Sequence, residues 1–220
     1  MPDLKEVIDL FLHVDRHLAE IVETYQAGTY GILFAIIFAE TGLVVTPFLP
    51  GDSLLFAAGA LAARDILNLG LLLVLLSVAA ILGDAVNYTV GATLGRRISP
   101  DNRWIKKEYL DKTQAFYDKH GAKTIVLARF VPIVRTFAPF MAGMGNMSYT
   151  RFAIYNISGA VLWIFSMTIA GYLFGGLPIV EEYFSLVVLG IVAVSLLPIL
   201  ISWIQSRRAA ARIAAEPPVV

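Results

Sequence analysis

Residues 128–139, ARFVPIVRTFAP, place two arginines inside a strongly apolar stretch. Arg129 and Arg135 are six positions apart, with Pro132 halfway between them. In an unbroken helix, six positions correspond to about 600°, so the two side chains would point about 120° apart. Because proline removes a backbone hydrogen bond and bends a helix, a break at Pro132 would let both guanidinium groups face one cavity. The stretch therefore predicts a broken apolar helix whose two charges act together.

The composition around this stretch is that of an integral membrane protein. Of the 220 residues, 58% are hydrophobic and 15% are charged, whereas a soluble domain usually carries about 25% charged residues. The charged N-terminal segment lacks the apolar core of a cleavable signal peptide. Cysteine is absent, which excludes disulfides, thiol catalysis and cysteine-based metal sites. We expect neither a metal ion nor another cofactor.

Three apolar segments have about the 20 residues that a helix needs to cross a bilayer, namely 66–88, 153–174 and 183–204. Two further apolar regions, 31–63 and 124–146, are interrupted in the middle. Interrupted segments of this kind predict re-entrant hairpins, which tolerate irregular backbone at membrane depth where it lines a cavity or is buried in protein. Kinked transmembrane helices are the alternative. The expected breaks fall at Pro47, Pro50, Gly51, Pro132 and Pro139.

Lysine and arginine set the expected orientation in the membrane. They gather in the loop 96–123 and in the tail 206–220, whereas residues 1–27 hold only two of them against six acids. The positive-inside rule therefore predicts a cytoplasmic loop and a cytoplasmic C-terminus. Residues 3–25 alternate apolar and charged positions in steps of three and four, which predicts an amphipathic helix in the interface or on the protein's own exterior.

The two halves of the chain resemble each other at a fixed distance. Residues 56–59 (FAAG) resemble residues 140–143 (FMAG), and the tyrosine of 87–91 (NYTVG) matches that of 171–175 (GYLFG), both with an offset of 84. Each unit is expected to be a broken hairpin followed by a spanning helix, and the charge pattern gives the two units opposite orientations. The predicted fold class is an all-α integral membrane protein built as an inverted repeat, with an extra C-terminal transmembrane helix.

This reading divides the chain into three parts. Residues 1–27 form an amphipathic interfacial helix, residues 28–205 form a single transporter domain, and residues 206–220 form a cytoplasmic tail. Within the domain we expect repeat 1 at about 28–95, the basic loop at 96–123, repeat 2 at about 124–180 and the last span at 183–204.

Few ionisable residues lie in the apolar segments, and each is costly there, by about 2.5–3.5 kcal/mol on insertion scales. Glu40 and Asp52 flank the first break, Arg129 and Arg135 flank the second, and Asp84 lies near the predicted inner end of its helix. Arginine forks suit phosphate, and carboxylates desolvated beside one another can carry protons. The alternative is structural, with two ion pairs that clamp the hairpins together. Asp84 and Asn87 either join the same polar chamber or cap the helix end.

At these residues the sequence resembles the DedA family, which is related to the SNARE-associated Golgi or VTT-domain proteins. The resemblance covers roughly residues 28–180 in the right order. It rests on several motifs: Glu40-Thr41-Gly42, Thr46-Pro47-Phe48-Leu49-Pro50-Gly51-Asp52, Gly83-Asp84, Ala128-Arg129-Phe130-Val131-Pro132-Ile133-Val134-Arg135-Thr136 and Ala142-Gly143.

The resemblance implies a multi-pass lipid transporter of the bacterial cytoplasmic (inner) membrane. Bacterial members of the family are implicated in returning undecaprenyl phosphate to the cytoplasmic face, and dependence on proton motive force is a family theme. The family's important acids fall on Glu40 and Asp52 and its arginines on Arg129 and Arg135. We expect the arginines to bind the substrate phosphate, the acids to couple protons, and Asp84, Asn87 and Thr136 to line the chamber.

Functions other than lipid phosphate transport fit part of the same pattern. A flippase or scramblase for phospholipids such as phosphatidylethanolamine fits the same resemblance. A proton-coupled antiporter for small cations suits the acids, but two arginines in the chamber would repel its substrate. We expect no enzyme, because no histidine–glutamate metal motif, nucleophile elbow or glycine-rich phosphate loop is present. The expected partners are membrane lipids and protons, not nucleic acid, and the sequence is compatible with a homo-oligomer.

Overall fold

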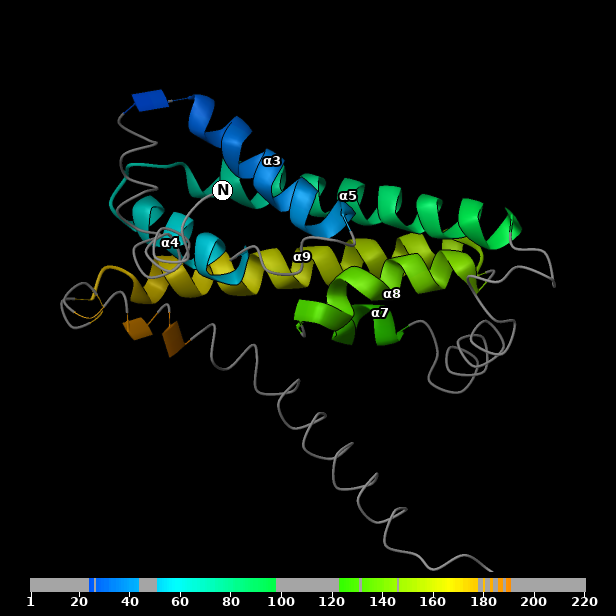
Figure 1. Ribbon diagram of the computed structural model, residues 1–220. Coiled ribbons are helices and arrows are strands. Elements are labelled where there is room, and N and C mark those ends of the chain that lie inside the picture. The colour runs from blue at the N-terminus through cyan, green and yellow to red at the C-terminus, as the bar shows by residue number, and fades with distance from the viewer. Residues whose placement is uncertain are drawn as a thin grey trace, which may run out of the picture.

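The structure, a computed structural model, is built from helices (Figure 1). It describes residues 24–25, 27–43, 51–97, 123–130, 132–145, 147–177, 180, 183, 186–187 and 189–190. No strand occurs among these residues. The helices are α3 (Gly28–Gly42), α4 (Gly51–Ala63), α5 (Leu69–Arg97), α7 (Lys123–Ala128), α8 (Pro132–Met144) and α9 (Tyr149–Phe174). Nearly all of the predicted N-terminal amphipathic helix, and most of the basic loop, the last span and the tail, lie outside the described residues.

Two helices, α5 and α9, are long and apolar enough to cross a membrane. Each has an apolar run of 26 residues, or about 39 Å of helix against a hydrocarbon core of about 30 Å. They contact each other and run in opposite directions (Figure 1). A stripe of exposed apolar side chains follows one face of α5 at three- and four-residue steps, as expected of a lipid-facing surface. Its members are Leu71, Val74, Val78, Leu82, Val86, Val90 and Leu94.

The other helices in the described part of the chain are too short to span the hydrocarbon core. α3 has 15 residues and α4 and α8 have 13 each, so none is longer than about 23 Å. The first interrupted region is indeed two helices, with Gly42 ending α3 and Gly51 beginning α4. Pro47 and Pro50 lie outside the described residues. In the second region, the helices are separated by Arg129 and the two residues after it.

The two prolines of the second region have different places. Pro132 is the first residue of α8, a position that suits proline because the N–H there has no partner within the helix. The break expected at Pro139 is wrong, because this residue lies inside α8, which continues to Met144. A proline inside a helix forfeits one hydrogen bond and costs about 3 kcal/mol. The extensive packing of α8 along α5 offsets that loss.

The second short helix of each unit packs on the long helix of the other unit, whereas α3 and α7 pack on the long helix of their own unit. α4 lies along α9, and α8 lies along α5 (Figure 1). Two equivalent pairs of glycines permit this contact. A Cβ at Gly59 would overlap the carbonyl of Thr168, and one at Gly171 would overlap the carbonyl of Phe56. In the other pair of helices, Gly143 meets Tyr88 and Gly91 meets Phe140 in the same way. The packing of the two units is therefore reciprocal.

These contacts refine the internal repeat. Gly59 corresponds to Gly143, with the predicted offset of 84, but Gly91 corresponds to Gly171, with an offset of 80. The long helices also begin 80 residues apart, at Leu69 and Tyr149. The tyrosines in α5 and α9 that the sequence matched, with an offset of 84, are therefore four residues away from the structural alignment of the two helices. Because four residues are about one helical turn, the displaced pattern still falls on nearly the same face.

Candidate functional site

Five ionisable side chains are buried among the described residues: Glu40, Asp52, Asp84, Arg129 and Arg135. They are the same five that the sequence singles out. They come from α3, α4, α5, the turn after α7, and α8. Ion pairs connect the two arginines to all three acids, so the interrupted segments do bring their charges together.

Arg135 is held by both acids of the first interrupted region. Its Nη2 donates to Glu40 Oε1, and its Nη1 donates to Asp52 Oδ1 at 3.1 Å. The indole Nε1 of Trp163 donates to the same Asp52 oxygen at 2.8 Å. The guanidinium carbon lies 4.4 Å from the centroid of the Trp163 ring, within the range of a cation–π contact. We call this set, Arg135 with Glu40, Asp52 and Trp163, the locked half of the site.

The start of α4 is shaped around the Glu40 carboxylate. A Cβ at Gly51 would overlap this carboxylate, so a larger residue at this position would displace the carboxylate from its observed place. Asp52 follows in the first turn, where the positive end of the helix dipole stabilises a negative charge. The break in the first region thus brings two acids, twelve positions apart in the sequence, onto one guanidinium.

Arg129 is held differently. Its Nη2 donates to Asp84 Oδ2 at 2.5 Å and to Asn156 Oδ1 at 2.6 Å, and the Asn156 amide donates in turn to the carbonyl of Ile81 at 3.1 Å. Within the described part of the chain, Arg129 Nε and Nη1 and Asp84 Oδ1 have no hydrogen-bond partner. Arg129 is only 1% exposed, so water does not satisfy these donors from a surface. We call Arg129 with Asp84 and Asn156 the open half of the site.

Asn87 ties the two interrupted regions to α5. Its side-chain amide donates to the carbonyl of Thr41 at 3.2 Å, at the end of α3, and to the carbonyl of Thr136 at 2.7 Å, in α8. Thr136 is buried, and its backbone carbonyl makes this contact. Neither Asp84 nor Asn87 caps the inner end of its own helix, because α5 runs on to Arg97. Both residues hydrogen-bond or pair with groups of the other helices, Asp84 with Arg129 and Asn87 with Thr41 and Thr136.

The pairing of charges differs from the expected one. The structural alternative drawn from the sequence had two ion pairs between the hairpins, whereas both hairpin acids meet Arg135 and the partner of Arg129 is Asp84 of a long helix. Sequence reasoning also missed Asn156 and Trp163 as site residues. They are seven positions apart on α9, or about two turns, so both point from one face. An asparagine in an otherwise apolar span was the available signal, since buried polar groups in membrane segments are costly.

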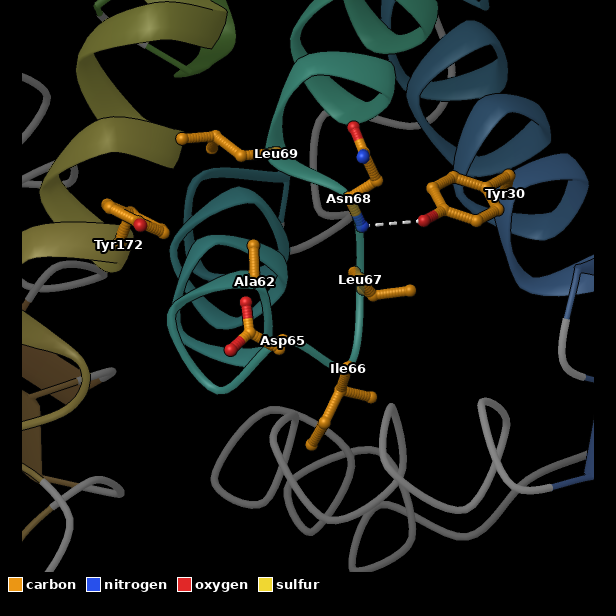
Figure 2. Close-up of a pocket in the computed structure, with 8 residues that line it drawn as sticks. All are labelled: Tyr30, Ala62, Asp65, Ile66, Leu67, Asn68, Leu69 and Tyr172. Carbon is orange, nitrogen blue, oxygen red and sulfur yellow. Dashed lines mark hydrogen bonds between the residues drawn. The ribbon is translucent and has the colours of Figure 1, made fainter.

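A pocket of about 400 Å³ lies apart from these charges, where α4 turns into α5 (Figure 2). Asp65 has a left-handed backbone (φ 59°) at the end of α4, and Asn68 caps α5 by accepting from the Leu71 N–H at 2.9 Å. The Asn68 N–H donates to the Tyr30 hydroxyl at 2.7 Å. None of the five buried charges lines this pocket. In the described residues, no group of three or more histidine, aspartate or glutamate side chains is arranged to hold a metal ion.

Comparison with known proteins identifies close relatives. The profile of the VTT domain matches residues 49–173. "Protein DedA" of Escherichia coli K12 is 57% identical over 212 residues, which cover 94% of this chain and 97% of that protein. "Uncharacterized membrane protein ML0287" of Mycobacterium leprae is 41% identical over 192 residues, 86% of each chain. "Inner membrane protein YqjA" of E. coli K12 is 36% identical over 157 residues, 70% of this chain and 71% of that protein. No solved structure matches.

Proposed function

The chain belongs to the VTT-domain (DedA) family of membrane proteins, and from this premise we propose that it transports a lipid across the bacterial cytoplasmic membrane. The proposed substrate is an anionic lipid phosphate, such as undecaprenyl phosphate, recycled for envelope synthesis. Its movement is coupled to protons. The proposed chamber is formed by the locked and open halves of the site.

The observation that carries the proposal is the set of unused donors on Arg129. A buried polar group without a partner costs about 1–3 kcal/mol, and more when it is charged. A phosphate oxygen beside Nε and Nη1 would remove that cost, and charge-assisted hydrogen bonds from guanidinium to phosphate are among the strongest in proteins. The guanidinium carbons of the two arginines lie 4.4 and 5.9 Å from the centroid of the same Trp163 ring, so both charges are near one buried side chain.

The balance of charge supports proton coupling. The site holds three carboxylates and two guanidiniums, so it carries an excess negative charge when every group is ionised. A phosphate adds further negative charge, and its binding therefore favours protonation of a carboxylate. Protonation of Glu40 or Asp52 would also loosen Arg135 from the locked half. Proton uptake and phosphate binding then assist each other.

The arrangement in the membrane is part of the same proposal. α5 and α9 cross the bilayer in opposite directions, and the short helices form two re-entrant hairpins that meet near the midplane. Reciprocal packing of two units and broken helices beside buried charges are features of transporters built from inverted repeats. The basic loop and the C-terminus lie on the cytoplasmic side.

The decisive experiment is lipid transport by the purified protein in proteoliposomes. Labelled polyprenyl phosphate and labelled phosphatidylethanolamine are compared, each with and without a pH gradient. We expect the lipid phosphate to move faster, to depend on the gradient, and to lose its transport in Arg129→Ala. Gly31→Ala is the matched control, because nothing lies within 4 Å of a Cβ placed at that glycine. Equal movement of phosphatidylethanolamine without a gradient would establish a phospholipid scramblase instead.

The excess carboxylate also favours a second candidate, a proton-coupled antiporter for small cations. The same vesicles loaded with a labelled cation distinguish it. We expect no cation flux, because two guanidiniums border the chamber. Flux that survives neutralisation of Arg129 or Arg135 would favour the antiporter, and release of inorganic phosphate from the lipid would show an enzyme.

A further inference from the structure

We propose that Trp163 is a positioning residue that links the protonation of Asp52 to the release of Arg135. The proposal rests on the proposed function, since it assigns the device by which a proton makes the second guanidinium available to a lipid phosphate. Trp163 is fully buried on α9, in the core between the two units. It contacts both members of the ion pair that must separate.

One oxygen of the Asp52 carboxylate accepts hydrogen bonds from two donors. Asp52 Oδ1 accepts from Trp163 Nε1 at 2.8 Å and from Arg135 Nη1 at 3.1 Å. An indole N–H can only donate, so Trp163 hydrogen-bonds the carboxylate of Asp52 and has no acceptor to offer the proton of a neutral carboxyl group. A proton on this carboxyl group therefore weakens the contact to Trp163 and the contact to Arg135 together.

Both guanidinium groups also lie near the Trp163 ring. The Arg135 guanidinium carbon lies 4.4 Å from the ring centroid, and that of Arg129 lies 5.9 Å from it. The attraction between a cation and an aromatic face does not depend on the carboxylates, so it persists when they are neutral. Trp163 can then keep Arg135 within the chamber, beside the unpaired donors of Arg129.

All the charged groups around Asp52 enter this balance. Arg135 from α8 and Glu40 from α3 are the nearest, and Arg129 and Asp84 of the open half lie beyond them. Arg135 is paired with Asp52, and Glu40 shares the same cation. Trp163 differs from these groups because it carries no charge. Its removal therefore changes the hydrogen bond to Asp52 without changing the total charge of the site.

The test separates the ring of Trp163 from its N–H. Trp163→Phe keeps an aromatic face and loses the donor, whereas Trp163→Leu loses both. Because a hydrogen bond to a charged group contributes about 1.5–3 kcal/mol, we expect the pH at which transport is half-maximal to rise by about one unit or more in Trp163→Phe. In Trp163→Leu we expect the rate to fall at least tenfold at every pH.

The matched control is Phe152→Leu. Phe152 is buried on the same helix and stacks on Tyr88 at 4.4 Å, away from the charges. We expect a similar loss of thermal stability and an unchanged pH profile. If the Trp163→Phe profile coincides with that of the wild type, or if Phe152→Leu shifts the profile equally, the positioning role is refuted.

A second measurement keeps Trp163 in place and does not use transport. In the full chain with Trp104→Phe and Trp203→Phe, the fluorescence of Trp163 is followed against pH. We expect a transition that is absent in Asp52→Asn and retained in Asp84→Asn. Identical curves in these two variants would overturn the link between Asp52 and Trp163. Loss of the transition only in Asp52→Asn, in a protein that moves no lipid phosphate, would uphold the link and refute the proposed function.

Discussion

The two buried arginines are of one residue type, lie six positions apart, and differ in what surrounds them. Arg135 meets two carboxylates and the face of an indole, whereas Arg129 meets one carboxylate and one amide and keeps Nε and Nη1 unpaired. Under the proposed function, a structural clamp and a phosphate-binding site lie in one cluster of charges. The locked half resembles a clamp, although Arg135 Nε and Glu40 Oε2 are unpaired there. The open half has more unused hydrogen-bonding capacity, with Arg129 Nε and Nη1 and Asp84 Oδ1 unpaired.

Replacement of each arginine by alanine should have the largest effect on transport and on thermal stability. Arg135→Ala leaves Glu40 and Asp52 buried without their cation, and breaking a buried pair costs about 3–5 kcal/mol. We expect lost transport and a large fall in the thermal unfolding temperature in detergent. Arg129→Ala should also lose transport, but with a smaller fall, because one carboxylate rather than two loses its partner. Equal destabilisation by the two variants would contradict the division into halves.

An exchange of charges tests whether the Glu40–Arg135 pair has only a structural role. Glu40→Arg combined with Arg135→Glu preserves the observed pair with its polarity reversed. We expect the double variant to unfold at a higher temperature than Arg135→Ala, yet to transport no lipid phosphate, because the guanidinium no longer lies on α8. Recovered transport would mean that the pair serves only to hold the helices together.

Gly51 offers a test of the locked half that alters no charge. Gly51→Ala places a methyl group in the space of the Glu40 carboxylate and should displace it from Arg135. We expect at least a tenfold loss of transport, together with destabilisation of about 1–3 kcal/mol, typical of overpacking. Gly31→Ala, on α3 with open space around it, should leave both measurements unchanged. A normal transport rate in Gly51→Ala would show that the position of Glu40 is unimportant.

The smallest effect is expected in the open half. Asn156→Ala removes one neutral acceptor from Arg129 while Asp84 remains in place. We expect a loss of stability of about 1 kcal/mol and a several-fold rise in the lipid concentration for half-maximal transport, with the maximal rate nearly preserved. Dose–response curves in proteoliposomes measure both quantities. A fall in the maximal rate alone would place Asn156 outside phosphate binding.

The sequence alone determined which residues are buried and charged. In a chain with so few charges inside its apolar segments, each one stands out, and all five are buried in the structure. It also located the interruptions near Gly51 and Pro132, because glycine and proline act locally on the backbone. The break expected at Pro139 was wrong because that local effect is offset by packing against another helix.

Which charges pair could be seen only in the tertiary structure, and not in the sequence. Asp84 and Asn156 meet Arg129, and Trp163 meets Asp52, across separations of 27 to 111 positions that no local pattern encodes. The internal repeat is also only partly visible in the sequence. Matching residue types align the two long helices with an offset of 84 residues, whereas their glycine contacts align them with an offset of 80. Hydropathy and backbone preferences depend on neighbours along the chain. The pairing of charges depends on how helices cross, which is fixed by close contacts between their surfaces.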